Sequence, residues 1–355
     1  MSQNPQIHAV KSDHKGAHAE SKMRIGVIGY GYWGPNIVRN FSTVDGASVV
    51  AVCDLRDDFL KKVEKNHAGV RTTKNCDELI CATDIDAVAI VTPVFTHFEL
   101  AKKALEAGKH VFVEKPFTYT VAQAEELINL AEQKHLKIMV DHTFLFTGSV
   151  RKMKQLVDDG TLGKIYYYDS MRVNLGLFQH DVNVVWDLAP HDLAIMFYVL
   201  GRKPKAVVAT GSAHVKPGME DMAYLTFYFD DNVIAHVNVN WLSPVKVRTT
   251  LVGGQKKMLV WNDNEPDEKI KIYDKGVEVK NAEGVYNLLV SYRSGDMWAP
   301  KVEQTEALKL EAQYFVECCG NGMKPINDGA AGLEVVRMLE GAIESLRNRG
   351  GMVEL

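Results

Sequence analysis

A glycine-rich turn between an apolar run and a helix constrains this chain more than any other feature. Residues 25–28 are apolar, and three glycines with the spacing G-x-G-x-x-G follow them at Gly29, Gly31 and Gly34. The first glycine permits a tight turn, the second lets the backbone approach a pyrophosphate, and the third lets the next helix pack closely on the strand. Free N–H groups at the start of that helix attract phosphate. The turn therefore predicts a dinucleotide-binding unit.

An acidic residue follows at the distance that such a unit requires. Asp54 ends the next apolar run and lies 20 residues beyond Gly34. A carboxylate there accepts hydrogen bonds from the ribose hydroxyls of NAD and repels the extra phosphate of NADP. NADP remains the less favoured alternative cofactor, because an arginine such as Arg56 near this position can hold a 2′-phosphate. The pattern favours NAD, with an ordinary turn in another doubly wound domain as the alternative.

The composition is that of a soluble protein with two domains. The chain has 355 residues, of which 46% are hydrophobic and 24% are charged. Its net charge of −4 argues against nucleic acid and anionic membranes as partners. No apolar stretch approaches the ~20 residues of a membrane span, and the start lacks the apolar core of a secretory signal. The five cysteines form no C-x-x-C pair, which predicts reduced thiols and a cytoplasmic location.

The order of strand and helix patterns divides the chain. Residues 1–22 are polar and aperiodic, and we expect a disordered tail. In residues 23–143 strands alternate with helices, which predicts a Rossmann domain with a parallel sheet that binds ligands at the carboxyl ends of its strands. Residues 144–355 contain successive β runs between 206 and 273, which predicts an α/β domain with a large, mostly antiparallel open sheet. The last helix, residues 329–348, is expected to pack back on the first domain.

A lysine stands where the sheet of the first domain should bind its ligand. The predicted strand at residues 110–113 runs into Glu114-Lys115-Pro116. A lysine at a carboxyl strand end can donate to, or accept from, a substrate hydroxyl beside the nicotinamide. An ordinary Glu–Lys pair at the surface explains these residues equally well.

A carboxylate and an imidazole stand four residues apart, at Asp187 and His191. We expect Asp187 to cap the helix at residues 188–200, with Pro190 in its first turn. Both side chains then lie on one face at a helix N-terminus, where the dipole keeps the imidazole neutral and able to take a hydroxyl proton. A capping Asp and a half-buried His are equally compatible with the spacing. Two such residues without a third ligand predict no metal site.

These motifs together resemble the Gfo/Idh/MocA family (glucose–fructose oxidoreductase and inositol dehydrogenase), across nearly the whole chain from Met23. The resemblance implies that Lys115, Asp187 and His191 bind and deprotonate the reacting hydroxyl beside C4 of the nicotinamide. This chain departs from the family pattern at one place: Val184-Val185-Trp186 replaces a glycine run that is common in the family. Trp186 is therefore expected to present an aromatic face to the substrate. The predicted cofactor contacts are Gly29, Gly31, Tyr32, Trp33, Gly34, Asp54, Thr92, Pro93, His97, Glu114 and Lys115.

Two stretches, Gly-Tyr-Gly-Tyr-Trp-Gly-Pro-Asn at residues 29–36 and Trp-Asp-Leu-Ala-Pro-His-Asp at residues 186–192, resemble a subset of this family. Members of that subset oxidise or reduce C3 of UDP-activated amino sugars for surface polysaccharides. Arg172 and Asn174 are the further candidates for substrate binding, because a diphosphate needs a cation and hydroxyls need amides. A surface salt bridge is the alternative for Arg172. An inositol or free-sugar dehydrogenase is the second interpretation, and a non-catalytic NAD-binding sensor is the third. An exposed sheet face needs cover, which predicts a homodimer or homotetramer.

Overall fold

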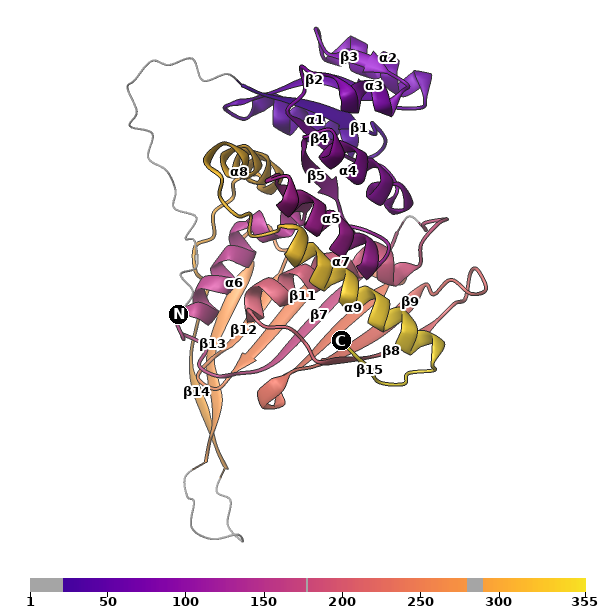
Figure 1. The fold of residues 1–355 in the computed structure, drawn as a ribbon. Coiled ribbons are helices and arrows are strands. Elements are labelled where there is room, and N and C mark those ends of the chain that lie inside the picture. The colour runs from indigo at the N-terminus through magenta and orange to yellow at the C-terminus, as the bar shows by residue number, and fades with distance from the viewer. Residues whose placement is uncertain (1–21, 177, 280–289) are drawn as a thin grey trace, which may run out of the picture.

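The computed structural model describes residues 22–176, 178–279 and 290–355. Two sheets, each accompanied by helices, make up this part of the chain (Figure 1). The predicted tail lies outside the described residues except for Lys22. In the described ranges, no helix is both long and apolar enough to cross a bilayer.

The first sheet is parallel and is built from strands between Met23 and Asp141. Its strands in the described residues are β1 (Met23–Ile28), β2 (Ala47–Cys53), β3 (Arg71–Thr73), β4 (Ala87–Ile90), β5 (His110–Glu114) and β6 (Ile138–Asp141). Their order is β3-β2-β1-β4-β5-β6, so the direction of growth reverses at β1. Ligands bind at such a switch point, beyond the carboxyl ends of the strands. The predicted Rossmann sheet is confirmed.

Helices connect these strands. They are α1 (Gly34–Thr43), α2 (Asp57–Asn66), α3 (Cys76–Cys81), α4 (His97–Glu106) and α5 (Val121–Gln133), with a short 3-10 helix η1 (Val94–Thr96) before α4. All four residues of β4 are buried, as expected for a parallel strand that is covered on both faces.

The second sheet contains nine strands in the described residues, in the order β14-β13-β12-β11-β7-β10-β9-β8-β15. They are β7 (Ile165–Leu175), β8 (Ala206–Ser212), β9 (Met222–Tyr228), β10 (Ile234–Asn240), β11 (Leu242–Gly254), β12 (Met258–Asn262), β13 (Ile270–Val279), β14 (Val290–Trp298) and β15 (Val353–Glu354). Every pairing is antiparallel except that of β7 with β10. The predicted open, mostly antiparallel sheet is confirmed.

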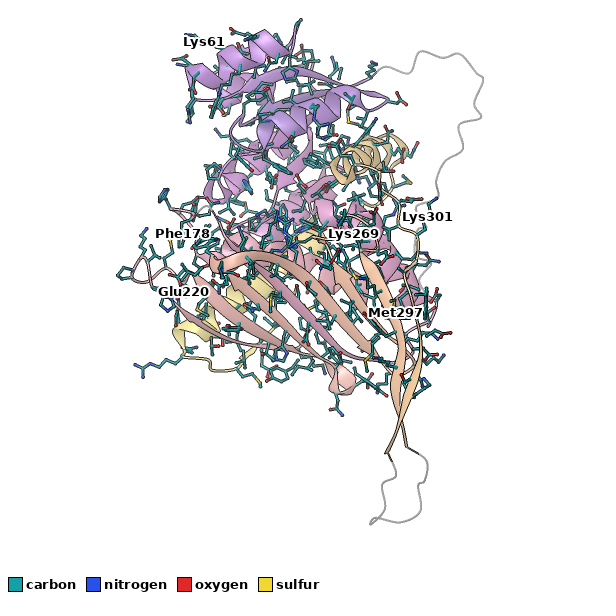
Figure 2. The ribbon with its side chains drawn as sticks, turned by 180° about the vertical axis from the view of Figure 1, so that it is seen from behind. Lys61, Phe178, Glu220, Lys269, Met297 and Lys301 are labelled. Atoms are coloured by element: carbon teal, nitrogen blue, oxygen red, sulfur yellow. The ribbon has the colours of Figure 1, made fainter. Side chains whose placement is uncertain are left out.

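Helices cover one face of the second sheet, and Figure 2 shows this sheet in front of them, from the opposite side. The remaining helices are α6 (Gly148–Asp158), α7 (Val184–Leu200), α8 (Ala307–Asn321) and α9 (Gly329–Arg347), with 3-10 helices η2 (Thr143–Phe146) and η3 (Asp230–Asn232). Helix α7 lies against β7 and β10 and also against α9.

The last two helices both contact the first domain. Phe315 of α8 packs against Phe41 and Phe112, with ring centroids 5.9 and 5.6 Å apart. Before α9, the main-chain carbonyl of Asn327 accepts from the N–H of Val140 in β6, and the side-chain amide of Asn327 donates to the carbonyl of Val140. The sequence predicts such contact only for the last helix. C-terminal residues therefore help to build the core beneath the first sheet.

Helix α7 begins earlier than the sequence predicts. Its N-cap is Asn183, whose side chain accepts from the N–H of Trp186 at 3.2 Å, and not Asp187. The longer helix buries Val184, Val185 and Trp186 almost completely, which favours the earlier start. The sequence also misses strands β3, β14 and β15, and it names no separate β run for β13.

Candidate active site

The glycine turn after β1 has the shape that a pyrophosphate requires. Gly29 has a φ of +99°, and a Cβ there would meet the carbonyl oxygen of Val91 at 2.3 Å. A Cβ on Gly34 would meet the carbonyl oxygen of Gly29 at 2.5 Å, whereas no described atom lies within 4 Å of a Cβ built on Gly31. The turn thus has no room for a side chain at Gly29 or Gly34. At Gly31, just before α1, the backbone is accessible to a ligand. These residues fit the pyrophosphate of NAD.

Asp54 lies beside this turn at the end of β2. Its Oδ2 accepts from the N–H of Tyr30 at 2.7 Å and its Oδ1 from the N–H of Arg56 at 2.9 Å. Each carboxylate oxygen keeps a lone pair for a ribose hydroxyl. The guanidinium of Arg56 makes two hydrogen bonds to Asp58 and lies 3.9 Å from the ring centroid of Phe59. Arg56 is therefore engaged elsewhere, and the arrangement fits NAD better than NADP.

The loop after β4 carries Thr92, Pro93 and His97. The ring nitrogens of His97 lie 2.8 Å from the carbonyl oxygen of Thr92 and 2.9 Å from that of Pro116, and the ring is buried. Burial lowers the pKa of His97. His97 thus ties two loops together, whereas Thr92 and Pro93 remain partly exposed at the strand ends.

Tyr32 and Trp33 occupy different environments. Tyr32 is 93% exposed, while Trp33 is half-buried and its Nε1 donates to Asp141 at 3.3 Å. Asp141 pairs with Glu114 in the register of β5 and β6. Loss of water around Glu114 and the neighbouring Asp141 raise the pKa of Glu114 well above 4.5. The raised pKa favours the protonated form of Glu114, and Trp33 links the glycine turn to these strand ends.

Lys115 joins the two domains. Its Nζ donates to the main-chain carbonyl of Asp187, in α7, at 3.0 Å. The carboxylate of Asp187 accepts from Nε1 of the buried Trp241 at 3.0 Å. Trp241, which the sequence does not single out, thus orients this carboxylate. The structure brings Lys115 and Asp187 together, as the sequence predicts.

His191 lies in the same helix, but farther from the helix N-terminus than the sequence predicts. Counting from Val184 it is the eighth residue of α7, and Pro190 is the seventh, so neither is in the first turn. The helix dipole fades beyond the first turn. Burial lowers the pKa of His191 well below 6.5, and the charges of Lys115 and Arg172 lower it further. The neutral ring is as expected, but its cause is burial and positive charge.

Arg172 does not stand free for a substrate phosphate. It is 3% exposed, and it donates to the buried carboxylate of Asp192, which also accepts from Ser170. The alternation of side chains along β7 puts Arg172 and Asn174 on the helix-covered face of the strand, where Asp192 of α7 neutralises the arginine. Asn174 is half-buried near the end of that strand.

Two further residues border the site. His142 follows β6, and the register of Glu114 with Asp141 places it beside Lys115. Both of its ring nitrogens are buried with no hydrogen-bond partner among the described residues, and the same holds for Nδ1 of His191. The rule that ligands bind beyond carboxyl strand ends could have predicted His142. Arg248 of β11 pairs in register with Arg172 and remains one-third exposed.

Aromatic rings lie beside the start of α7. Trp186 is 6% exposed and stacks on Tyr119 at 4.9 Å, and Tyr119 in turn contacts Phe95 at 4.7 Å. The aromatic face that the sequence assigns to Trp186 is thus covered by Tyr119. Tyr119 and Phe95 present the exposed rings instead.

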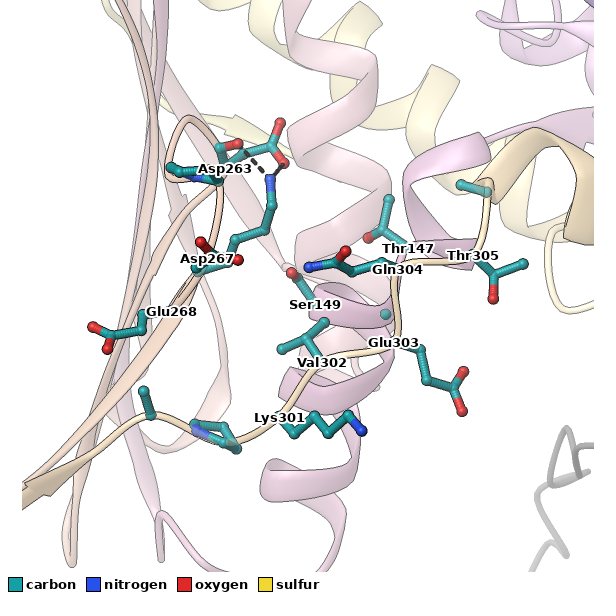
Figure 3. Close-up of a pocket in the computed structure, with 16 residues that line it drawn as sticks. Thr147, Ser149, Asp263, Asp267, Glu268, Lys301, Val302, Glu303, Gln304 and Thr305 are labelled. Atoms are coloured by element: carbon teal, nitrogen blue, oxygen red, sulfur yellow. Dashed lines mark hydrogen bonds and ion pairs between the residues drawn. The ribbon is translucent and has the colours of Figure 1, made fainter.

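A separate cavity of about 890 Å³ lies between the first turn of α6, the β12–β13 turn and residues 299–305 (Figure 3). None of the predicted site residues lines it. Its wall contains Asp263, which binds Lys269 at 3.2 Å and also accepts from Arg248 at 3.3 Å. Arg248 therefore stands between this cavity and the candidate site. In the described ranges, no group of three or more His, Cys, Asp and Glu side chains is arranged to hold a metal ion.

Known proteins share this architecture. A family model for the oxidoreductase family with an NAD-binding Rossmann fold matches residues 23–142, and one for the GFO/IDH/MocA C-terminal domain matches residues 150–260. The UDP-N-acetylglucosamine 3-dehydrogenase of Acidithiobacillus ferrooxidans is 27% identical over 325 residues, which cover 88% of this chain and 94% of that protein. The myo-inositol 2-dehydrogenase of Thermotoga maritima is 28% identical over 233 residues, which cover 61% and 68%.

Solved structures agree on the fold. The scyllo-inositol dehydrogenase of Lactobacillus casei, solved with bound cofactor NAD(H) and scyllo-inositol, has a TM-score of 0.76 and 22% identity, with 94% of this chain and 99% of that chain covered. The chain therefore belongs to the Gfo/Idh/MocA family of oxidoreductases and is an NAD-dependent dehydrogenase that acts on CH–OH groups.

Proposed function

We propose that this dehydrogenase transfers hydride between NAD and the C3 hydroxyl carbon of a UDP-activated amino sugar, in the biosynthesis of a surface polysaccharide. The observation that carries the chemistry is the 3.0 Å hydrogen bond from Lys115 to the carbonyl of Asp187, four residues before a neutral His191. It joins the carboxyl end of β5 to the helix of the second domain. A hydroxyl held there meets donor and base together.

Each residue has a separate role in the oxidation direction. NAD, when bound, accepts the hydride from the carbinol carbon. His191 takes the hydroxyl proton, because its neutral ring offers a lone pair. Lys115 donates a hydrogen bond to the same oxygen and stabilises the negative charge that develops there. Asp187, held by Trp241, accepts from a neighbouring sugar hydroxyl.

Two features near the candidate site, a partly exposed cation and a pair of exposed aromatic rings, support a nucleotide sugar as the substrate. Arg248 is a partly exposed cation near His191, and it replaces Arg172 as our candidate for binding the diphosphate. The exposed rings of Phe95 and Tyr119 offer a face on which a nucleobase can stack. Asn174, half-buried on the same sheet face as Arg172, stays a candidate for a sugar hydroxyl. The full-length match to a UDP-N-acetylglucosamine 3-dehydrogenase agrees with this substrate class.

An inositol or free-sugar dehydrogenase is the second candidate function. The observation in its favour is the similarity to a myo-inositol 2-dehydrogenase, at the same level of identity. The same proton transfer serves both substrates, so the difference lies in what Arg248 and the aromatic rings bind.

We also propose that the outer face of the second sheet pairs with another copy of the chain. The alternation of side chains along β7, β9 and β11 places the exposed Met171, Tyr224, Tyr228 and Leu251 on this face. Exposed apolar side chains on a sheet face that no helix covers favour association. A homodimer or homotetramer would bury it.

Absorbance at 340 nm tests the substrate. Purified protein with NAD is offered UDP-N-acetylglucosamine, its uronate, myo-inositol and free hexoses in parallel. A rise with a UDP-sugar alone is the expected result. A rise with myo-inositol or a free hexose would overturn the nucleotide-sugar proposal and keep the hydride mechanism. Tight NAD binding without turnover of any reduced or oxidised form of these sugars would point to a sensor.

A further inference from the structure

Two cysteines are in contact beside Asp54. Cys53 is the last residue of β2 and is fully buried, and Cys76 is the first residue of α3 and is half-buried. Their Sγ atoms lie 3.3 Å apart. The hydride transfer proposed above uses neither thiol, so this contact needs another explanation.

The surroundings make the two thiols unequal. A hydrogen bond from the thiol of Cys53 lowers the pKa of Cys76 to about 7, and Lys103 acts in the same direction, while burial and Asp77 oppose them. The same hydrogen bond and burial raise the pKa of Cys53. Cys76 is therefore the better nucleophile and the more accessible one, and Cys53 is placed to react second.

We propose that Cys53 and Cys76 are an oxidation site, which closes to an intramolecular disulfide on exposure to a peroxide and thereby weakens NAD binding. The sulfur of Cys76 attacks one oxygen of hydrogen peroxide, the O–O bond breaks, and sulfenic acid and one water result. The sulfur of Cys53 then attacks the sulfenic sulfur, and its proton leaves with the hydroxyl as a second water. Two thiols lose two electrons, and one peroxide is reduced to two waters.

Closing the bond moves the backbone that carries Asp54. The sulfur atoms must approach by about 1.2 Å, from 3.3 Å to the ~2.05 Å of a disulfide. They belong to different elements, the end of β2 and the start of α3. Asp54 follows Cys53 directly, and its N–H donates to the carbonyl of Thr73, at the end of β3, at 3.2 Å. The expected loss of NAD affinity rests on the proposed hydrogen bonds between Asp54 and the ribose hydroxyls of NAD.

The test uses the full-length protein and needs no sugar substrate. Reduced protein is treated with hydrogen peroxide, the remaining thiols are alkylated, and peptides are identified by mass spectrometry. In parallel, NAD binding is measured by calorimetry before and after oxidation. We expect a peptide pair joined through Cys53 and Cys76. We also expect a Kd for NAD that rises roughly tenfold or more, as for a lost hydrogen bond to a charged group, and that dithiothreitol restores.

Cys81 provides the matched control, because it ends the same helix and is exposed. Cys81→Ala should form the bridge and lose NAD affinity as the unmodified protein does. Cys76→Ala should do neither, and Cys53→Ala should leave a sulfenic acid on Cys76 that dimedone traps. The main measurement on the unmodified protein stands even if a variant fails to fold.

Two results would overturn the proposal. One is a Cys76 that stays reduced at peroxide concentrations that oxidise Cys81. The other is a Cys53–Cys76 bridge that leaves the Kd for NAD unchanged. A reduced protein that fails to bind NAD would refute the assignment of Asp54 itself, and this is seen before any peroxide is added.

Discussion

His191 is kept neutral by burial and by nearby positive charge, and this sets the expected pH dependence. In the proposed mechanism the base form of the ring takes the proton, and a lowered pKa keeps that form present at lower pH. We predict that kcat/KM stays flat as pH falls from 8 to 6.5 and declines only at lower pH. His191→Asn should remove that decline and reduce the rate by about 10²–10⁴. A decline centred at or above pH 6.5, or an unaltered profile in His191→Asn, would contradict this role.

His142 illustrates a polar residue that stability alone does not explain. Its two ring nitrogens are buried with no partner in the described part of the chain, and burial with the charge of Lys115 lowers its pKa to about 3. Replacing such a group by an apolar ring is close to neutral for folding or stabilising. We propose that His142 hydrogen-bonds a hydroxyl of the substrate, so His142→Phe should keep or raise the Tm while kcat falls by roughly tenfold or more. Full activity in this variant would show that His142 does not serve the site.

At the scale of elements, one buried ion pair fixes α7 on β7. Arg172 and Asp192 are both nearly inaccessible, and removal of one charge leaves the other buried without compensation. Asp192→Asn should lower the free energy of unfolding by about 3–5 kcal/mol, measured by urea denaturation. Asp230→Asn is the matched control, because its pair with Lys205 is exposed to solvent and should contribute far less to stability than the buried pair. Equal effects of the two substitutions would rule out this role for Arg172.

The sequence predicts the elements better than their ends and partners. Alternating β and α patterns and the glycine turn are local signals, and they suffice for five of the six described strands of the first sheet and for Lys115. The start of α7 depends on whether Asn183 or Asp187 caps it, and both are good caps; tertiary burial of Trp186 decides. Similarly, the position of Arg172 on its strand is a local property, whereas its pairing with Asp192 depends on how α7 packs.

At the scale of the whole molecule, the uncovered face of the nine-stranded sheet predicts self-association. Tyr224 is 50% exposed on that face, and a charge there should oppose pairing with a second copy. We expect the protein to elute as a dimer or tetramer in size-exclusion chromatography with light scattering, and Tyr224→Glu to shift it towards monomer. Met352→Glu, an exposed residue near the C-terminus, should leave the mass unchanged. A monomeric unmodified protein would contradict the proposal.

The proposed active site is also a property of the whole molecule. Lys115 comes from the first sheet, Asp187 and His191 come from a helix of the second domain, and Trp241 orients the carboxylate from the second sheet. Motifs identify the first three residues. Only the fold shows which of their atoms meet, because that depends on how the two domains pack.

The most direct test of this account is the initial rate of absorbance change at 340 nm, with NAD and the sugar that the substrate series selects, for the unmodified protein, Lys115→Met and the exposed control Lys61→Met. We predict that Lys115→Met loses about 10²-fold or more in kcat with NAD affinity retained, and that Lys61→Met is unaffected. Turnover by Lys115→Met at the unmodified rate would contradict it.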